Sequence, residues 1–208
     1  MKISYAITVC NEFKEIQTLL NFLKENKREQ DEIVVLFDKR GGTPEVWSFL
    51  NKINVDKLEA ATFKNHFADW KNYLNNLCSG DYIFQIDADE VPNKKLIDTL
   101  PSLLEGNSNI DLFLVPRVNT VDGLTQEHIN KWRWNVNEKG WVNWPDYQTR
   151  IMQNGPKIKW QNKVHEQIVG VSTKGALPME EEWCLYHPKD IKRQEAQNNF
   201  YDTLENIR

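Results

Sequence analysis

Residues 81–92 read DYIFQIDADEVP, and they carry the strongest structural signal in the chain. The stretch follows a Ser-Gly turn signal, continues as the apolar run 82–86 and ends at Pro92. A short run of β-branched and aromatic residues between turn signals predicts a buried strand. The carboxylates of Asp87, Asp89 and Glu90 come directly after that run. The sequence therefore predicts a buried strand that delivers acidic side chains to its C-terminal end.

Two of these carboxylates, Asp87 and Asp89, are two positions apart. On an extended backbone such residues point the same way, so their charges are expected to repel each other. A divalent cation removes that repulsion, and carboxylate oxygens suit Mg²⁺ or Mn²⁺. The alternative is an acidic surface turn that caps a helix beginning near Asn93. The preceding strand favours the metal site, because ligands of open α/β sheets bind at the carboxyl ends of strands.

The sequence Ile86-Asp87-Ala88-Asp89-Glu90 resembles the Asp-x-Asp motif of nucleotide-sugar glycosyltransferases with the GT-A fold, and is most similar to glycosyltransferase family 2. The resemblance implies an α/β fold with a mostly parallel, Rossmann-like sheet flanked by helices and a smaller, mixed C-terminal part. It implies a metal-dependent enzyme that transfers a sugar from a nucleoside-diphosphate sugar to an acceptor hydroxyl. A UDP-sugar is the favoured donor, and the motif would hold Mn²⁺ or Mg²⁺ against its diphosphate.

Length and composition agree with one α/β domain over residues 1–208, since the chain has 208 residues of which 40% are apolar. We expect a nucleotide-binding half at 1–115 and an acceptor-side half with a closing helix at 116–208. A net charge of −4 gives no support for a nucleic-acid partner. The three widely spaced cysteines match no disulfide or zinc pattern, which favours reduced thiols and a cytoplasmic setting. We expect no signal peptide and no transmembrane segment.

Strands and helices are expected to alternate through the first half, which predicts βαβ units and a parallel sheet. The expected strands are 2–9, 32–37, 58–63, 82–86 and 110–115, and the expected helices begin near residues 13, 43, 66 and 92.

Polar residues follow the first two strands, where the resemblance places the nucleotide base. Asn11 can also act simply as a helix cap. The Asp-Gly-Ser sequence usual after the second strand is absent, and the two basic residues found there read equally as an exposed loop. The residues that the resemblance assigns to the nucleotide are Cys10, Asn11, Glu12 and Asp38.

Positive side chains are needed near the donor diphosphate. The helix at 66–77 carries Lys71 and Asn72 where family 2 has a basic residue followed by Asn, although Arg is commoner there. A lone lysine on a helix is usually solvated, so its place in the pattern carries this expectation. Arg150 is a second candidate for the diphosphate, and Ala88 lies within the motif itself.

A second match lies far from the first. The run from Thr149-Arg150-Ile151-Met152 to Val164-His165-Glu166 resembles one branch of family 2, which includes lipopolysaccharide-core and peptide glycosyltransferases. We expect a hairpin of strands 147–152 and 158–160 around the Asn-Gly turn signal. A strand at 183–186 and a helix at 190–207 complete the chain.

The resemblance implies an inverting reaction with a carboxylate base. Glu166 is the leading candidate, Asp146 is the reserve, and His165 would orient the base or contact the donor. His165 and Glu166 can also be a surface strand pair. Asp89 is expected to bind the metal directly, while Asp87 binds the ribose or binds the metal through water. GT-A enzymes often recruit a C-terminal histidine to the metal, and His187 is the candidate.

Four of the eight tryptophans fall in the polar segment 131–144. Aromatic faces stack on sugar rings, so Trp141 and Trp144 are candidate acceptor contacts, with Glu90 beside the motif. The alternatives are that the tryptophans fill a loosely packed half and that Glu90 caps a helix. The expected acceptor is a saccharide, a lipid-linked molecule or a peptide.

Three other functions fit parts of the pattern. A nucleotidyltransferase would show a Gly-rich basic loop after its first strand, which is absent here. A glycoside hydrolase needs two carboxylates across a cleft and no metal. A carbohydrate-binding module would explain the tryptophans but would leave Asp87 and Asp89 without a task.

Overall fold

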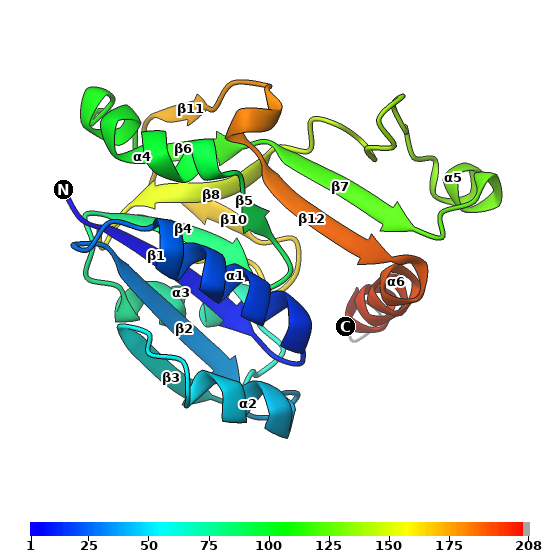
Figure 1. The fold of residues 1–208 in the computed structure, drawn as a ribbon, viewed down its shortest axis with the longest axis horizontal. Helices are drawn as coiled ribbons and strands as arrows, with labels where there is room; N and C mark the ends of the chain where they lie inside the picture. The colour runs from blue at the N-terminus through cyan, green and yellow to red at the C-terminus, as the bar shows by residue number, and fades with distance from the viewer. Residues whose placement is uncertain (206–208) are drawn as a thin grey trace.

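The computed structural model describes residues 1–205, with side chains described up to residue 198, as an α/β protein built on one large sheet (Figure 1). The sheet has seven strands in the order β11-β6-β8-β4-β1-β2-β3. Its parallel centre consists of β1 (Ile3–Val9), β2 (Glu32–Asp38), β3 (Lys57–Ala61) and β4 (Tyr82–Asp87). β6 (Leu112–Val115) and β11 (Lys174–Ala176) run the same way, and β8 (Gln148–Gln153) runs antiparallel between β4 and β6. The sheet thus takes strands from both sides of residue 115.

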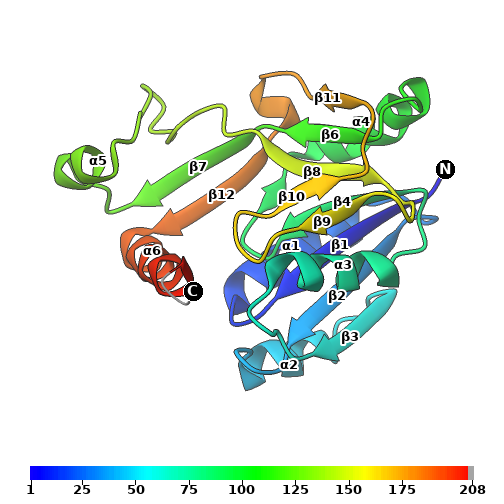
Figure 2. The same ribbon diagram turned by 180° about the vertical axis from the view of Figure 1, so that it is seen from behind.

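Helices cover both faces of this sheet, as expected for an α/β fold. One face packs against α1 (Phe13–Asn26), α2 (Pro44–Leu50) and α4 (Lys94–Gly106) in one apolar cluster. The other face carries α3 (Phe67–Leu77) and the two-stranded sheet of β9 (Lys159–Gln161) and β10 (Gln167–Val169), seen in Figure 2. Every residue of β2 is buried, because both faces of the sheet are covered there.

A three-stranded sheet forms an arm beside the large sheet (Figure 1). It pairs β12 (Leu185–Asp190) in parallel with β7 (Arg117–Asp122) and antiparallel with the short β5 (Val91–Pro92). α5 (Gln126–Trp132) follows β7, a 3₁₀ turn at Glu181–Trp183 precedes β12, and α6 (Ile191–Glu205) follows it. Because β5 comes directly after Glu90, the arm is joined to the large sheet at the acidic motif.

Two expected elements are wrong. The strands near 147–152 and 158–160 do not form a hairpin, because β8 inserts into the large sheet and β9 pairs with β10. Asn154 still makes a turn, with its side chain donating to the carbonyl oxygens of Cys78 and Gly80. The expected strand 183–186 begins later and continues to Asp190. Pro188 is tolerated because β7 is the only neighbour of the strand beyond Tyr186.

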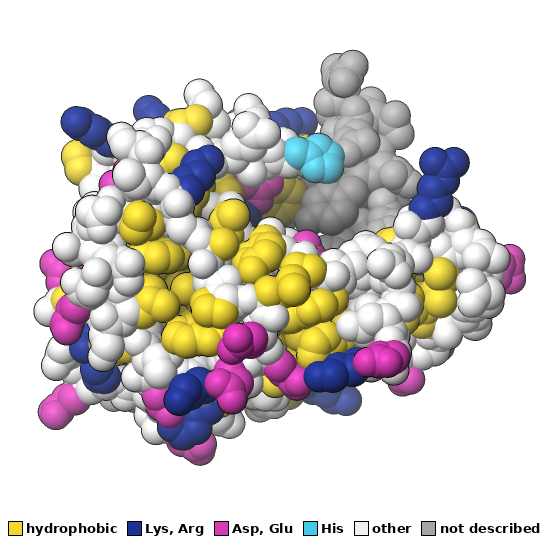
Figure 3. All heavy atoms as spheres, turned by 90° about the horizontal axis from the view of Figure 1, so that it is seen from above, with side chains coloured by type: hydrophobic (Ala, Val, Ile, Leu, Met, Phe, Trp, Pro, Cys, Tyr) yellow, Lys and Arg dark blue, Asp and Glu magenta, His cyan; other side chains and the backbone are white. Residues whose placement is uncertain are grey.

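The closing helix agrees with the expectation up to Glu205, and residues 206 and 207 of that expectation lie outside the described residues. Among the described residues, no helix is long and apolar enough to cross a membrane. Seen from above, hydrophobic side chains gather between acidic and basic ones on one face (Figure 3).

Candidate active site

A cleft of about 990 Å³ lies between the C-terminal ends of the central strands and the arm. Parallel strands end at the same edge of a sheet, so the residues after β1, β2 and β4 meet there. The cleft is lined by most of the residues expected from sequence, namely Cys10, Asn11, Glu12, Asp38, Lys71, Asp87, Ala88, Asp89, Asp146, Arg150, Glu166 and His187. Asn72, Glu90, His165, Trp141 and Trp144 do not line it.

Asp89 lies at the centre of a cluster of basic side chains from the arm. Its Oδ2 atom is 3.4 Å from Nε2 of His187, 3.8 Å from Nζ of Lys189 and 3.3 Å from Nη2 of Arg193. Burial raises the pKa of Asp89, but the hydrogen bond from His187 and the charges of Lys189 and Arg193 outweigh it and hold the pKa well below its usual value. Asp89 is therefore a carboxylate that stays ionised.

Asp87 points elsewhere, which corrects the expectation that the two aspartates share a direction. Asp87 is the last residue of β4, whereas Asp89 lies in a turn that the Glu90 amide closes by donating to the Asp87 carbonyl oxygen, at 2.9 Å. The alternation of an extended strand therefore ends before Asp89. The Asp87 carboxylate accepts a hydrogen bond from Arg150 on β8.

Glu90 has a structural task rather than the expected acceptor contact. Its side chain is fully buried, and its Oε1 accepts from Arg117 at 2.9 Å and from Arg150 at 2.6 Å. Its Oε2 accepts from the Asp87 amide at 3.1 Å. Helix α4 is capped by Asn93, not by Glu90. Direct contact between Glu90 and an acceptor is excluded by this burial, and Glu90 instead joins the arm to β4 and β8.

Asp146 is in the cleft, but its oxygens are engaged. Oδ2 accepts from Nε and Nη2 of Arg117 at 2.9 and 2.6 Å and from Nδ2 of Asn119 at 2.8 Å, while Oδ1 accepts from Gln148 at 2.7 Å. Burial raises the pKa of Asp146, but Arg117 and the hydrogen bonds outweigh it and lower the pKa. A carboxylate held in this way is a weak base, which argues against the reserve role given to Asp146.

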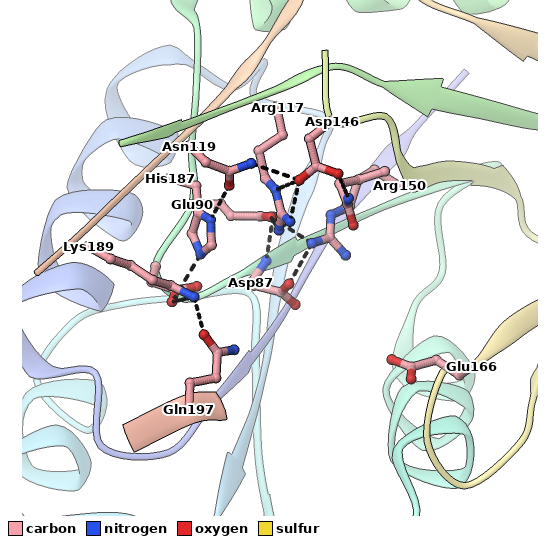
Figure 4. A network of polar contacts seen from close by, with 12 residues as sticks. Asp87, Glu90, Arg117, Asn119, Asp146, Arg150, Glu166, His187, Lys189 and Gln197 are labelled. Atoms are coloured by element: carbon pink, nitrogen blue, oxygen red, sulfur yellow. Dashed lines mark hydrogen bonds and ion pairs between the residues drawn. The ribbon is translucent and has the colours of Figure 1, made fainter. Parts of the chain in front are cut away.

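Glu166 lies apart from this network (Figure 4), in the loop between β9 and β10. Its Oε1 pairs with Nζ of Lys71, which also lies 4.3 Å from the ring centre of Trp160. Asn72 exchanges two hydrogen bonds with the backbone of Trp160, at 2.9 and 2.8 Å, so its amide fastens β9 to α3. His165 has a positive φ of 53° and turns the loop that presents Glu166.

The end of the cleft where the sequence predicts the nucleotide is held by two further carboxylates. Oε2 of Glu12 accepts from the Cys10 amide at 2.7 Å, and burial raises the pKa of Glu12. Asp38 accepts from the amides of Arg40, Gly41 and Phe63 at 3.0, 3.2 and 2.9 Å. The Asp38 carboxylate thus shapes the loops after β2 and β3 in addition to lining the cleft.

The two tryptophans expected to bind an acceptor lie in a separate hollow of about 540 Å³. Their ring centres are 4.9 Å apart with an edge-to-face geometry, and Nζ of Lys139 lies 4.4 Å from the ring centre of Trp141. Trp134 lines the main cleft instead.

The cleft residues that the sequence did not predict include four polar side chains around the acidic motif: Arg117, Asn119, Lys189 and Arg193. Arg117 and Asn119 lie two apart on β7 around the buried Val118, a polar-apolar-polar alternation that marks one face of a strand. Lys189 and Arg193 carry no such signal, because only the pairing of β12 with β7 brings them to Asp89.

The sequence predicts a divalent cation at this site, and few of the described side chains converge there to bind one. Among the described residues, no group of three or more His, Cys, Asp or Glu side chains gathers as a metal site. Asp89 and His187 alone converge, with a carboxylate oxygen and an imidazole nitrogen 3.4 Å apart. Neighbouring ligands of an octahedral ion with bonds of about 2.1 Å lie about 3 Å apart. The pair fits two positions of such an ion, and Asp87 does not join it in this arrangement.

Comparison with known proteins agrees with this geometry. The family described as glycosyl transferase family 2 matches residues 4–164. The chain belongs to glycosyl transferase family 2 and has the GT-A fold. No curated protein matches the chain.

Two solved structures are similar in fold. S. aureus TarS 1–349 in complex with UDP-GlcNAc matches with a TM-score of 0.63 and 15% identity, covering 91% of this chain and 59% of that chain. S. aureus TarS 1–349 matches with a TM-score of 0.61 and 16% identity, covering 90% and 60%. The chain thus spans less than two thirds of these structures, and at this identity the likeness shows the fold alone.

Proposed function

We propose that the protein transfers a sugar from a nucleoside-diphosphate sugar to an acceptor hydroxyl with the help of Mn²⁺ or Mg²⁺. The observation that carries the proposal is the convergence of Asp89 and His187 at the carboxyl edge of a parallel sheet, beside Lys189 and Arg193. A UDP-sugar is the favoured donor, since a structure of similar fold was solved with UDP-GlcNAc. In this proposal residues 1–115 supply the nucleotide side, and residues 116–208 supply His187 and the acceptor side.

Asp89 and His187 would hold the cation, which would supply positive charge against the leaving diphosphate. Lys189, with a side chain only 5% exposed, adds a fixed positive charge beside Asp89. Arg150 is committed to Asp87 and Glu90, so it acts by holding the motif in shape.

Glu166 is the proposed base of a direct displacement that inverts the anomeric carbon. The acceptor oxygen attacks that carbon, its proton passes to the Glu166 carboxylate, and the electron pair of the breaking bond leaves with the diphosphate. Lys71 orients Glu166 through their ion pair. The acceptor is a saccharide, a lipid-linked molecule or a peptide.

Titration calorimetry with UDP, GDP and dTDP, each with and without Mn²⁺ or Mg²⁺, tests the donor and the metal together. We expect tight binding of UDP only with the cation, followed by slow metal-dependent hydrolysis of a UDP-sugar. Metal-independent binding of free sugars without binding of any nucleotide would favour a carbohydrate-binding module. Release of pyrophosphate from a nucleoside triphosphate would favour a nucleotidyltransferase.

A further inference from the structure

Polar contacts link Arg117, Asp146, Asn119 and His187 in series (Figure 4). Arg117 donates twice to Oδ2 of Asp146, and Nδ2 of Asn119 donates to the same oxygen at 2.8 Å. Oδ1 of Asn119 lies 2.7 Å from Nδ1 of His187, whose Nε2 atom lies 3.4 Å from Asp89. The contacts thus join residues on β7 and β12 of the arm to Asp146, which precedes β8, and to Asp89 of the motif.

The direction of each hydrogen bond in this series follows from the negative charge of Asp146. An ionised carboxylate only accepts, so Asn119 must turn its NH₂ group toward Asp146. Its carbonyl oxygen is then the atom that faces His187, and it too only accepts. When His187 is protonated, Nδ1 donates to Asn119 and Nε2 donates to Asp89. When His187 is neutral, its one hydrogen must reside on Nδ1, and Nε2 carries the lone pair on the side of Asp89.

The sheet fixes the geometry of this contact. Asn119 on β7 and His187 on β12 lie directly opposite each other in the parallel register. The Asn119 backbone is also held, because its carbonyl oxygen accepts from the Val142 amide at 2.9 Å. The His187 side chain is only 9% exposed, so water has little access to compete for Nδ1.

We propose that Asn119, oriented by the ionised Asp146, is a positioning residue that fixes the Nδ1–H tautomer of His187 and so presents the Nε2 lone pair to a cation at Asp89. The role for a cation rests on the proposed function, whereas the tautomer does not. The ring nitrogen that binds a metal is set by the hydrogen bond that the other nitrogen makes. Asp146 thereby acts on the cation site through Asn119 and His187, as an orienting group and not as a base.

The tautomer can be read directly in the metal-free protein by ¹⁵N–¹H correlation spectra of the histidine rings, recorded at a pH at which the spectra themselves show a neutral His187 ring. We expect Nδ1–H in the wild type and loss of that preference in Asn119→Ala. Mn²⁺ affinity, followed by electron paramagnetic resonance, should fall about 10- to 100-fold in the same variant. Asn130→Ala, on the exposed face of α5, is the matched control and should change neither reading.

An exchange of the two side chains separates positioning from folding. In Asn119→Asp/Asp146→Asn, a carboxylate faces Nδ1 of His187 and an amide donates to that carboxylate, so the order of donors and acceptors is kept. We expect this double variant to retain Nδ1–H. An Nε2–H tautomer in the wild type, or unchanged spectra in Asn119→Ala, would overturn the proposal. If the wild type shows Nδ1–H, Asn119→Ala loses it, and the wild type binds no Mn²⁺, then Asn119 still positions His187. That result would refute the metal site of the proposed function.

Discussion

Nη2 of Arg193 lies 3.3 Å from Oδ2 of Asp89, although the two residues are 104 positions apart in the chain. The same guanidinium pairs with Glu15 on α1 and lies 3.6 Å from Glu12. One side chain thus fastens helix α6 to Glu15 on α1 and to the Asp89 turn, at the end of the cleft where we propose that the nucleotide binds. That side chain also neutralises the carboxylate that we assign to the cation.

Replacing Arg193 with Ala should tighten Mn²⁺ binding in the absence of nucleotide. Two unit charges about 4 Å apart interact by about 1 kcal/mol even in water, so removal of the competing charge predicts about a fivefold gain. Paramagnetic titration of Mn²⁺ measures the effect. Lys192→Ala removes the same charge from an exposed position on α6 and is the control. Unchanged or weaker affinity in Arg193→Ala would contradict competition at Asp89.

Asp89→Asn should abolish the cation-dependent part of UDP binding and leave the fold intact. The amide keeps the size of the side chain but loses the charge that attracts the cation. Calorimetry should show at least about a 100-fold loss with Mn²⁺, in line with loss of a ligand. Asp98→Asn on the exposed side of α4 serves for comparison. If Asp89→Asn binds UDP with wild-type affinity in the presence of Mn²⁺, the cation does not bind at this motif.

Glu166→Gln should lower turnover by about 10²- to 10⁴-fold, the usual contribution of a positioned base. Affinity for UDP should hardly change, because Glu166 lies apart from His187 and Lys189 (Figure 4). Steady-state rates and nucleotide titrations together decide. Near-normal turnover would exclude Glu166 as the base, and loss of UDP binding would place it on the donor side instead.

Glu90→Ala should lower the free energy of unfolding by about 3–5 kcal/mol, the usual cost of removing one partner from a buried ion pair. It leaves Arg150 with one acidic partner fewer in a site where its side chain is only 4% exposed. Urea unfolding measures the loss, with the exposed Glu182→Ala as control. A loss below about 1 kcal/mol would show that the Glu90 network is not structural.

Glu32, at the N-terminal end of β2, should make the stability of the protein sensitive to acid. Burial raises the pKa of Glu32, but hydrogen bonds from Lys2, Ser4 and Ser79 outweigh it and lower the pKa to about 2. A carboxyl whose folded pKa is depressed stabilises the fold above its unfolded pKa. That stability is present above about pH 4.5 and disappears as the pH falls toward about 2. Unfolding curves at several pH values give the free energy of unfolding, which should depend less on pH over this window in Glu32→Gln than in the wild type.

The elements that could be predicted from sequence depend on local signals. The strand before Asp87, the strand at 32–37 and the helix beginning near residue 43 each depend on neighbours in the chain, and the structure has all three. The meeting of the residues after β1, β2 and β4 could also be predicted, because the carboxyl ends of parallel strands lie at the same edge of a sheet.

The rest depends on pairing between distant segments, which no local pattern specifies. β8 looked like half of a hairpin, but its consecutive buried residues suit a central strand covered on both faces. Asn119 and Lys189 enter the cleft only because β7 and β12 pair in one particular register, and a shift by one residue would turn them away. Likewise, the turn after β4 separates Asp87 from Asp89 because Glu90 is drawn inward by Arg117 and Arg150.

The placement of β12 has a consequence for synthesis on the ribosome. The chain emerges from the ribosome N-terminus first. All four parallel central strands and Asp89 emerge before residue 90, yet the strand that brings His187 and Lys189 emerges almost 100 residues later. Until then β7 has no partner in the arm, and the acidic motif has none of its three basic neighbours. The residues of the cation site that we propose therefore cannot come together until almost the whole chain has been made.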